Sequence, residues 1–162
     1  MFIQPCFIRK NTLELREKLE ELGYKYSTTG GIKSNSIVVS FGCIFDIYPI
    51  DTIKRGFNNC VDCETNEELF LALAALRNDS DYMQWFVSPK THIHKRSGCF
   101  GQIFWMDGHY KEIIGYEWHR HENKDNALTE RLNAMIQMGV EDMEFLPHKA
   151  TVKEIIEHFK NK

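Results

Sequence analysis

One pattern occurs twice in this chain, 54 positions apart, and it constrains the fold more than any other feature. Residues 6–15 align with residues 60–69 so that a Cys, a Glu and a Leu coincide. Asn11 and Thr65 both fall where a helix N-cap is expected. The leucines of the two helices that follow keep the same register. Each copy therefore predicts a strand, a capped helix and a returning strand.

The predicted fold class is α+β. Residues 1–88 are expected to form a duplicated βαβ half that is ferredoxin-like, with the strands on one side and both helices on the other. Residues 89–162 add a β-hairpin and two helices. The Asp-Gly pair at 107–108 is the favoured two-residue turn between strands over 100–106 and 109–118. We expect the two halves to pack together as one compact unit.

The two helices of the repeat differ in their apolar faces. The first has one narrow stripe, formed by Leu15, Leu19 and Leu22, whereas residues 69–76 are apolar on every side. A helix that is apolar all round is buried on more than one side. We therefore expect the second helix to lie between its own sheet and either the C-terminal half or another subunit.

Local signals predict where elements begin and end. Capping boxes mark three helix starts, at Asn11 with Glu14, Thr65 with Glu68 and Thr151 with Glu154. A strand that begins at Tyr82 is expected to end at Pro89, because proline cannot donate to a sheet ladder. The basic stretch that follows, residues 90–98, is expected to be a loop or an edge strand.

Composition indicates a globular cytoplasmic protein. Of the 162 residues 43% are hydrophobic, which is enough for a core, and the formal net charge of −3 gives no general attraction to nucleic acid. No apolar run approaches the roughly 20 residues of a membrane span, and no signal peptide is recognisable. Five cysteines at irregular spacing are expected to be reduced thiols. We therefore expect neither membrane nor nucleic acid as a partner.

Two His-x-His pairs are the first candidate site, because the common nucleotide-binding and hydrolase motifs are absent from the sequence. His92 and His94 form one pair, and His119 and His121 the other. Residues i and i+2 of a strand share a face, so either pair could hold Zn²⁺ with a third ligand. The alternative is that both pairs flank polar loops and are simply exposed.

A single CxxC motif, Cys60 to Cys63, is the second candidate. A packing role is one interpretation, since Cys60 aligns with Cys6 in the repeat. A zinc site shared with a His pair and a redox site are the alternatives. A redox pair would lie on the first turn of a helix, whereas both thiols here precede the expected cap.

Aromatic residues concentrate in the middle of the chain, close to basic ones. Trp side chains there could stack a nucleotide ring, or they could belong to the core. The candidate ligand-binding residues are Trp85, His92, His94, Lys95, Arg96, Trp118, His119 and His121.

Two segments carry a resemblance to a known family. The stretch from Phe7 to Tyr24 and the stretch from Thr65 to Phe86 resemble small proteins of gut bacteria and of their phages and mobile elements. That family has no established activity, so the resemblance implies a context and no residue roles. The context is a cytosolic accessory protein, phage-encoded and acting in an infected host.

The sequence thus predicts a non-enzymatic binding protein. Its partner would be a host or phage protein, or a small nucleotide-like ligand that it sequesters. This interpretation assigns no catalytic residue, no metal and no cofactor. One alternative is a His-ligated, metal-dependent hydrolytic enzyme that uses zinc. A second alternative is a structural virion or assembly component, for which a symmetric homo-oligomer is expected.

Overall fold

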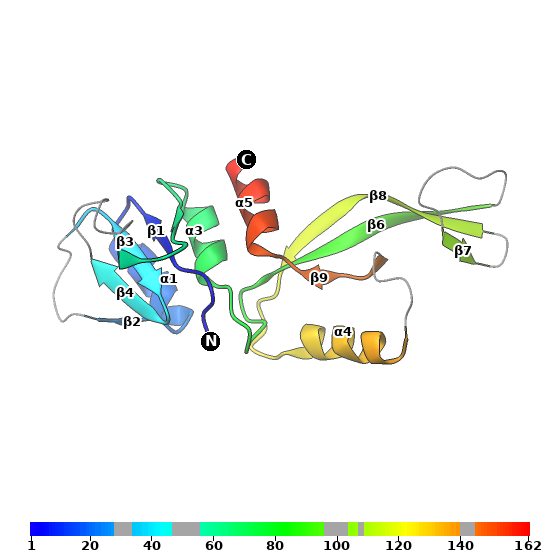
Figure 1. Ribbon diagram of the computed structural model, residues 1–162, viewed down its shortest axis with the longest axis horizontal. Coiled ribbons are helices and arrows are strands. Elements are labelled where there is room, and N and C mark those ends of the chain that lie inside the picture. Colours follow the sequence, from blue (N-terminus) through cyan, green and yellow to red (C-terminus); the bar gives the residue numbers. More distant parts are fainter. Residues whose placement is uncertain (28–33, 47–55, 96–103, 107–108, 140–144) are drawn as a thin grey trace.

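The computed structural model describes residues 1–27, 34–46, 56–95, 104–106, 109–139 and 145–162. Figure 1 shows an elongated molecule, with a mixed sheet at one end and a long antiparallel ribbon that projects to the other. The helices in the described ranges are α1 (Leu13–Glu21), α3 (Glu67–Ala74), α4 (Ala127–Gln137) and α5 (Val152–Lys160). The chain therefore has the predicted α+β character.

The first sheet has five strands in the order β2-β4-β3-β1-β5. Their bounds are β1 (Cys6–Ile8), β2 (Lys25–Tyr26), β3 (Ile37–Ser40), β4 (Cys43–Asp46) and β5 (Val61–Asp62). β1 runs antiparallel to β3 and parallel to β5, and β2 runs parallel to β4. Helices α1 and α3 share one core with side chains of a single face of this sheet, as predicted.

The second sheet has the order β7-β8-β6-β9 and is antiparallel throughout. Its strands are β6 (Trp85–Lys95), β7 (Phe104–Met106), β8 (His109–Arg120) and β9 (His148–Lys149). β7 and β8 form the predicted hairpin, although the turn at 107–108 lies outside the described residues. β9 pairs with only two residues of β6, so most of the ribbon consists of β6 and β8 alone within the described chain.

The expected duplication is not seen. The strands β1 and β5 are parallel neighbours and are each followed by a helix, as the alignment of the two copies requires. The returning strand of the first copy, β2, stays in the first sheet, whereas β6 enters the second sheet. A ferredoxin-like half would need β6 in the first sheet. The predicted boundary at residue 88 accordingly falls inside β6.

Two local predictions need correction for the same strand. β6 begins at Trp85 rather than Tyr82, and it continues through Pro89 to Lys95. Pro89 is tolerated because β9 pairs only with Phe86 and Val87, which leaves the position of Pro89 on the outer edge of the described sheet. The basic stretch after Pro89 is therefore strand up to Lys95.

Helix α3 is enclosed on two sides, as its all-round apolar sequence predicts. It packs on β1 on one side and on α5 on the other. Leu69, Phe70 and Leu73 are almost completely buried, and Ile155 of α5 belongs to the same core. The second layer that covers α3 is therefore α5, which belongs to the C-terminal half of the same chain.

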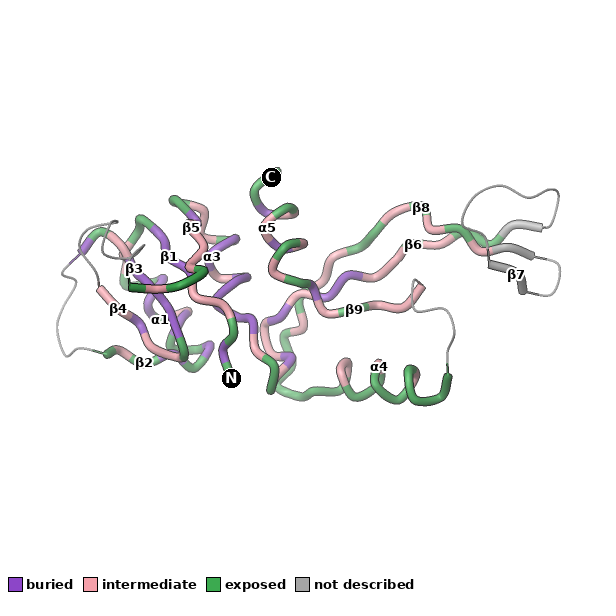
Figure 2. Tube along the Cα trace, in the orientation of Figure 1, coloured by how far each residue is buried: buried purple, intermediate pink, exposed green. Residues whose placement is uncertain are grey.

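Burial is uneven along the molecule. Figure 2 shows buried positions in the first sheet, α3 and the base of the ribbon, and mostly exposed positions along α4. Helix α4 has no buried residue, although Leu128 and Leu132 are half-buried. No helix in the described parts of the chain combines the length and the hydropathy that crossing a membrane requires.

Candidate functional site

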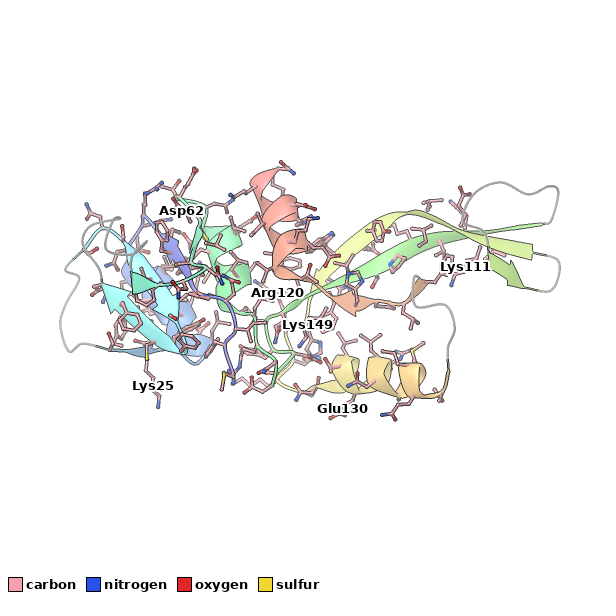
Figure 3. The ribbon with its side chains drawn as sticks, in the orientation of Figure 1. Lys25, Asp62, Lys111, Arg120, Glu130 and Lys149 are labelled. Atoms are coloured by element: carbon pink, nitrogen blue, oxygen red, sulfur yellow. The ribbon has the colours of Figure 1, made fainter. Side chains whose placement is uncertain are left out.

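A cleft of about 810 Å³ lies where α1, α3 and the end of α5 meet the base of the ribbon. Its residues come from distant parts of the chain. They are Lys18, Glu21, Leu22, Glu67, Glu68, Leu71, Ala72, Ala75, Tyr82, Met83, Trp85, Trp118, His119, Arg120, Glu122, Phe159 and Lys162. Figure 3 labels Arg120 at the base of the ribbon and Lys111 farther along it.

The register of the ribbon turns specific side chains toward this cleft. Trp85 lies opposite Arg120, and Val87 lies opposite Trp118. Residues that face each other across antiparallel strands share a face of the sheet, and so do residues i and i+2. All four therefore lie on one face of the ribbon, and the chain reversal that pairs β6 with β8 brings the two tryptophans together.

An aromatic cluster forms one wall. The ring centroids of Trp85 and Trp118 are 6.4 Å apart, and Trp85 meets Phe159 edge-on at 5.4 Å. His158 stacks on Trp118 with centroids 4.0 Å apart and an interplanar angle of 12°. Burial, and then the nearby Lys162, lowers the pKa of His158. The imidazole is therefore neutral at pH 7, so a stacked aromatic neighbour rather than a cation lies against Trp118.

Helix α3 supplies the opposite wall. Glu68, Leu71, Ala72 and Ala75 are spaced by three, one and three residues and therefore lie on one side of the helix. The small side chains of Ala72 and Ala75 leave room in the cleft, while Leu71 is half-buried at its surface. This wall is apolar apart from Glu67 and Glu68 at its N-terminal end.

The basic and acidic groups at the α1 side are largely paired with one another. Lys18 donates to Glu14 at 2.9 Å and to Glu67 at 3.1 Å, and Glu67 also accepts from Lys10 at 2.6 Å. The hydrogen bonds that Lys18 donates to Glu14 and then to Glu67 raise the pKa of Lys18. The bond from Lys10 and then that from Lys18 lower the pKa of Glu67, against the effect of its partial burial. Lys18 and Glu67 are therefore already engaged by partners of opposite charge.

At the ribbon side, Arg120 donates to Glu122 at 2.7 Å. Lys162 lies with Nζ 5.1 Å from the centre of the Phe159 ring. Glu21 and Glu68 make no ion pair with any residue that the structure describes. Among the lining side chains the cleft thus holds two carboxylates that are not neutralised by a salt bridge.

Only part of the predicted constellation is brought together. Trp85, Trp118 and His119 line the cleft, as a site built on the aromatic residues requires. His92 lies seven residues along β6 from Trp85, which is about 23 Å at the rise of a strand. His94 and Lys95 belong to β6, but their side chains, like all of Arg96, lie outside what the structure describes.

The pair His119 and His121 does share a face, but it packs on a ring. His119 stacks on Phe86 at 6.0 Å, and His121 meets the same ring edge-on at 6.2 Å. His121 Nε2 lies 2.9 Å from a carboxylate oxygen of Asp125. Within the described residues no group of three or more His, Cys, Asp or Glu is arranged to hold a metal ion. The described geometry of this pair is therefore that of packing and hydrogen bonding.

The CxxC cysteines are packing residues in this fold. Cys63 is buried, and Cys60 is half-buried. Burial, followed by the proximity of Cys63, raises the pKa of Cys60 to about 12. Burial also raises the pKa of Cys6, which lies next to Cys63. A redox-active thiol needs the opposite shift.

Several cleft residues were not among the sequence candidates. Glu21, Glu68, Leu71, Met83 and Phe159 all line the cleft. For the four that lie on helices the only signal is helix periodicity, which indicates a shared face but does not tell what that face meets. Met83 lies in the turn before β6 and carries no such signal. Comparisons of the chain with protein-family models, curated proteins and solved structures found no match.

Proposed function

We propose that this chain is a non-enzymatic, cytoplasmic binding protein, phage-encoded and acting as an accessory factor, and that the cleft at the base of the ribbon is its binding site. The observation that carries the proposal is the aromatic cleft between α1, α3, α5 and the ribbon. Binding sites of proteins are typically concave and mostly apolar, with a few polar groups that orient the ligand.

A small planar ligand of the nucleotide-like kind fits this cleft best. Its volume of about 810 Å³ lies within the range of roughly 300–1,000 Å³ that small-molecule sites occupy. Trp85 and Trp118 offer ring faces and edges for stacking, which contributes about 1–3 kcal/mol per base in known nucleic-acid sites. The apolar wall of α3 would cover the other side of the ring.

The test combines two measurements on the purified full chain. Native mass spectrometry reports any small molecule that co-purifies, and ligand-observed NMR reports binding of adenosine as a planar probe. Leu71→Trp should fill the cleft and abolish both signals, and because Leu71 is only half-buried at the edge of the core, the change leaves the fully buried side chains in place. Leu13→Trp is the matched control, because Leu13 is 64% exposed on α1 and does not line the cleft.

The proposal fails if the wild-type chain carries no ligand and adenosine does not bind at millimolar concentration. It also fails if adenosine binds equally well to Leu71→Trp and to Leu13→Trp, because the binding site would then lie elsewhere.

A partner protein is the second candidate, and the ribbon favours it. Ile93, Ile114 and Tyr116 are each more than half exposed on β6 and β8. Contiguous exposed apolar patches mark interaction surfaces, and we propose that a partner would bind the ribbon through these three side chains. Capture of a host or phage protein by the wild-type chain but not by Ile93→Ser/Tyr116→Ser would support this function, and equal capture by both would exclude the ribbon.

A further inference from the structure

We infer that the ligand of the cleft carries a positive charge rather than a phosphate. This inference rests on the proposed function, because it concerns the same site. It adds the sign of the ligand's charge to the proposed function. Among nucleotide-like ligands it favours a base or nucleoside with a positive charge over one that carries a phosphate. Three features of the cleft support it: the helix ends that border it, the carboxylates in its walls and the prior engagement of its cations.

Two helices present their C-terminal ends to the cleft. Lys18, Glu21 and Leu22 belong to the last turn and the cap of α1, and Phe159 and Lys162 lie at the end of α5. The C-terminus of a helix carries a partial negative charge and attracts cations. Phosphate sites are built at helix N-termini instead.

The one N-terminus at the cleft, that of α3, is already satisfied. The side chain of Asn66 accepts from the backbone N–H of Leu69 at 3.0 Å, and two acids, Glu67 and Glu68, occupy the first turn. A phosphate would have to displace or repel these carboxylates. A cation would instead be attracted by these two carboxylates.

Glu21 is the most informative of the acidic groups. It stands in the last turn of α1, where a carboxylate opposes the helix dipole, and it makes no ion pair within the described chain. Residues that break a local rule of this kind are expected at functional positions. Together with Glu68 it places unneutralised negative charge on two of the elements that line the cleft, α1 and α3.

The basic side chains of the cleft are mostly paired already and would therefore bind an anion weakly. Lys18 is held by two carboxylates and Arg120 by Glu122. Only Lys162 has no carboxylate partner among the described residues, and it lies over the Phe159 ring. Four acidic and three basic side chains line the cleft, so its sum is negative even before the helix ends are counted. A ligand cation would in addition gain from the tryptophan rings.

The experiment compares three probes with one planar base and different charges. They are 5′-amino-5′-deoxyadenosine, which is cationic at neutral pH, adenosine, which is neutral, and adenosine monophosphate. Isothermal titration at low and at physiological salt measures their affinities for the full chain. We expect the amine to bind at least about five-fold more tightly than adenosine and the monophosphate to bind most weakly, with a preference that shrinks as salt rises.

The variant Glu21→Gln/Glu68→Gln tests the assigned origin of this preference. Each exposed carboxylate should contribute about two- to five-fold to the preference for the amine, so the double variant should lose most of this preference and keep only the part that comes from the helix ends. Glu17→Gln is the matched control, because Glu17 is exposed on the same helix and does not line the cleft.

The outcomes separate the two proposals. Tighter binding of the monophosphate than of the amine, or an unchanged preference in the double variant, would overturn the charge assignment and leave the cleft as a binding site. If none of the three probes binds, the proposed function fails, and the charge assignment fails with it.

Discussion

Loss of the buried residue Asp81 should loosen α4 and β9 from the segment that leads into the ribbon. Asp81 is 1% exposed and forms an ion pair with Lys149 of β9 at 3.0 Å. Its carboxylate also accepts hydrogen bonds from the backbone N–H and the hydroxyl of Thr129 in the first turn of α4, and its own N–H donates to the Asn126 side chain. One carboxylate therefore joins β9, α4 and the segment that leads into the ribbon.

The magnitude follows from these partners. Removing one member of a buried ion pair costs about 3–5 kcal/mol, because the other charge is left without its partner. Lys149 is 27% exposed and keeps the carbonyls of Arg77 and Ser80 at 3.5 Å and 3.2 Å, which places Asp81→Ala at the lower end. We expect a loss of about 3 kcal/mol, or about 6–12 °C in Tm for a chain of this size.

Chemical denaturation measures the global loss, and hydrogen exchange shows where it acts. Exchange should rise throughout α4, which has no buried residue of its own, while the first sheet keeps its protection. Glu130→Gln, an exposed change on α4, should alter stability by no more than about 0.5 kcal/mol.

A double-mutant cycle decides whether the ion pair is the cause. If it is, Asp81→Ala/Lys149→Met should be clearly more stable than the sum of the two single losses predicts, since the unpaired ammonium is gone. Strict additivity, or α4 protection equal to that of the wild type in Asp81→Ala, would refute the argument.

Other parts of the fold give further expectations. Arg16→Ala should cost about 3–5 kcal/mol in denaturant unfolding, because it leaves the buried carboxylate of Asp46 unpaired, whereas Lys10→Ala at the surface should cost no more than about 1 kcal/mol. Burial lowers the pKa of His158, so as the pH falls the imidazole takes up a proton in the unfolded chain before it does so in the folded chain. Tm should therefore fall as the pH is lowered from about 7 through the folded pKa. His158→Phe should make this fall of Tm with pH less steep. Cys60, with a pKa of about 12, should react with iodoacetamide at pH 8 more slowly than a cysteine in a short peptide, and equal rates would contradict its burial.

Helix positions were predictable from the sequence, to within a residue. The capping box at Thr151 is confirmed, whereas the caps expected at Asn11 and Thr65 lie one residue later, at Thr12 and Asn66. Asn11 is not free to cap, because its amide donates to the Ser34 carbonyl and its oxygen accepts from Arg16. A side chain that can cap a helix can also form hydrogen bonds with distant residues. The sequence does not tell which of these partners lies nearby in the fold.

The destination of the strand after α3 was not predictable. A short apolar run indicates a strand but does not say which sheet it joins. Here β6 leaves the first sheet and continues into the ribbon, while α5 packs on α3. This single departure from the repeat creates the cleft, since the cleft lies at the point where β6 leaves the first half.

The same departure explains why the candidate residues separated into two groups. Trp85 and Trp118 come together because β6 and β8 pair in register at the base of the ribbon, and His119 follows them. A strand that continues straight for 11 residues carries His92 away from that base. Of the sequence candidates, Trp85, Trp118 and His119 therefore line one cleft, whereas His92 lies farther along the ribbon.

The aromatic cluster serves both the fold and the cleft, and this determines which variants are informative. Trp85 and Trp118 line the cleft, but they also pack on Phe159 and His158 and so help to hold α5 against the ribbon. Alanine at either tryptophan would remove a binding surface and a structural contact together, and a loss of binding could not be assigned to one of them. Filling the cleft from Leu71, or neutralising carboxylates at its rim, leaves this cluster intact. Changes of those two kinds isolate recognition from folding, because the atoms they alter face the cleft and not the contact between α5 and the ribbon.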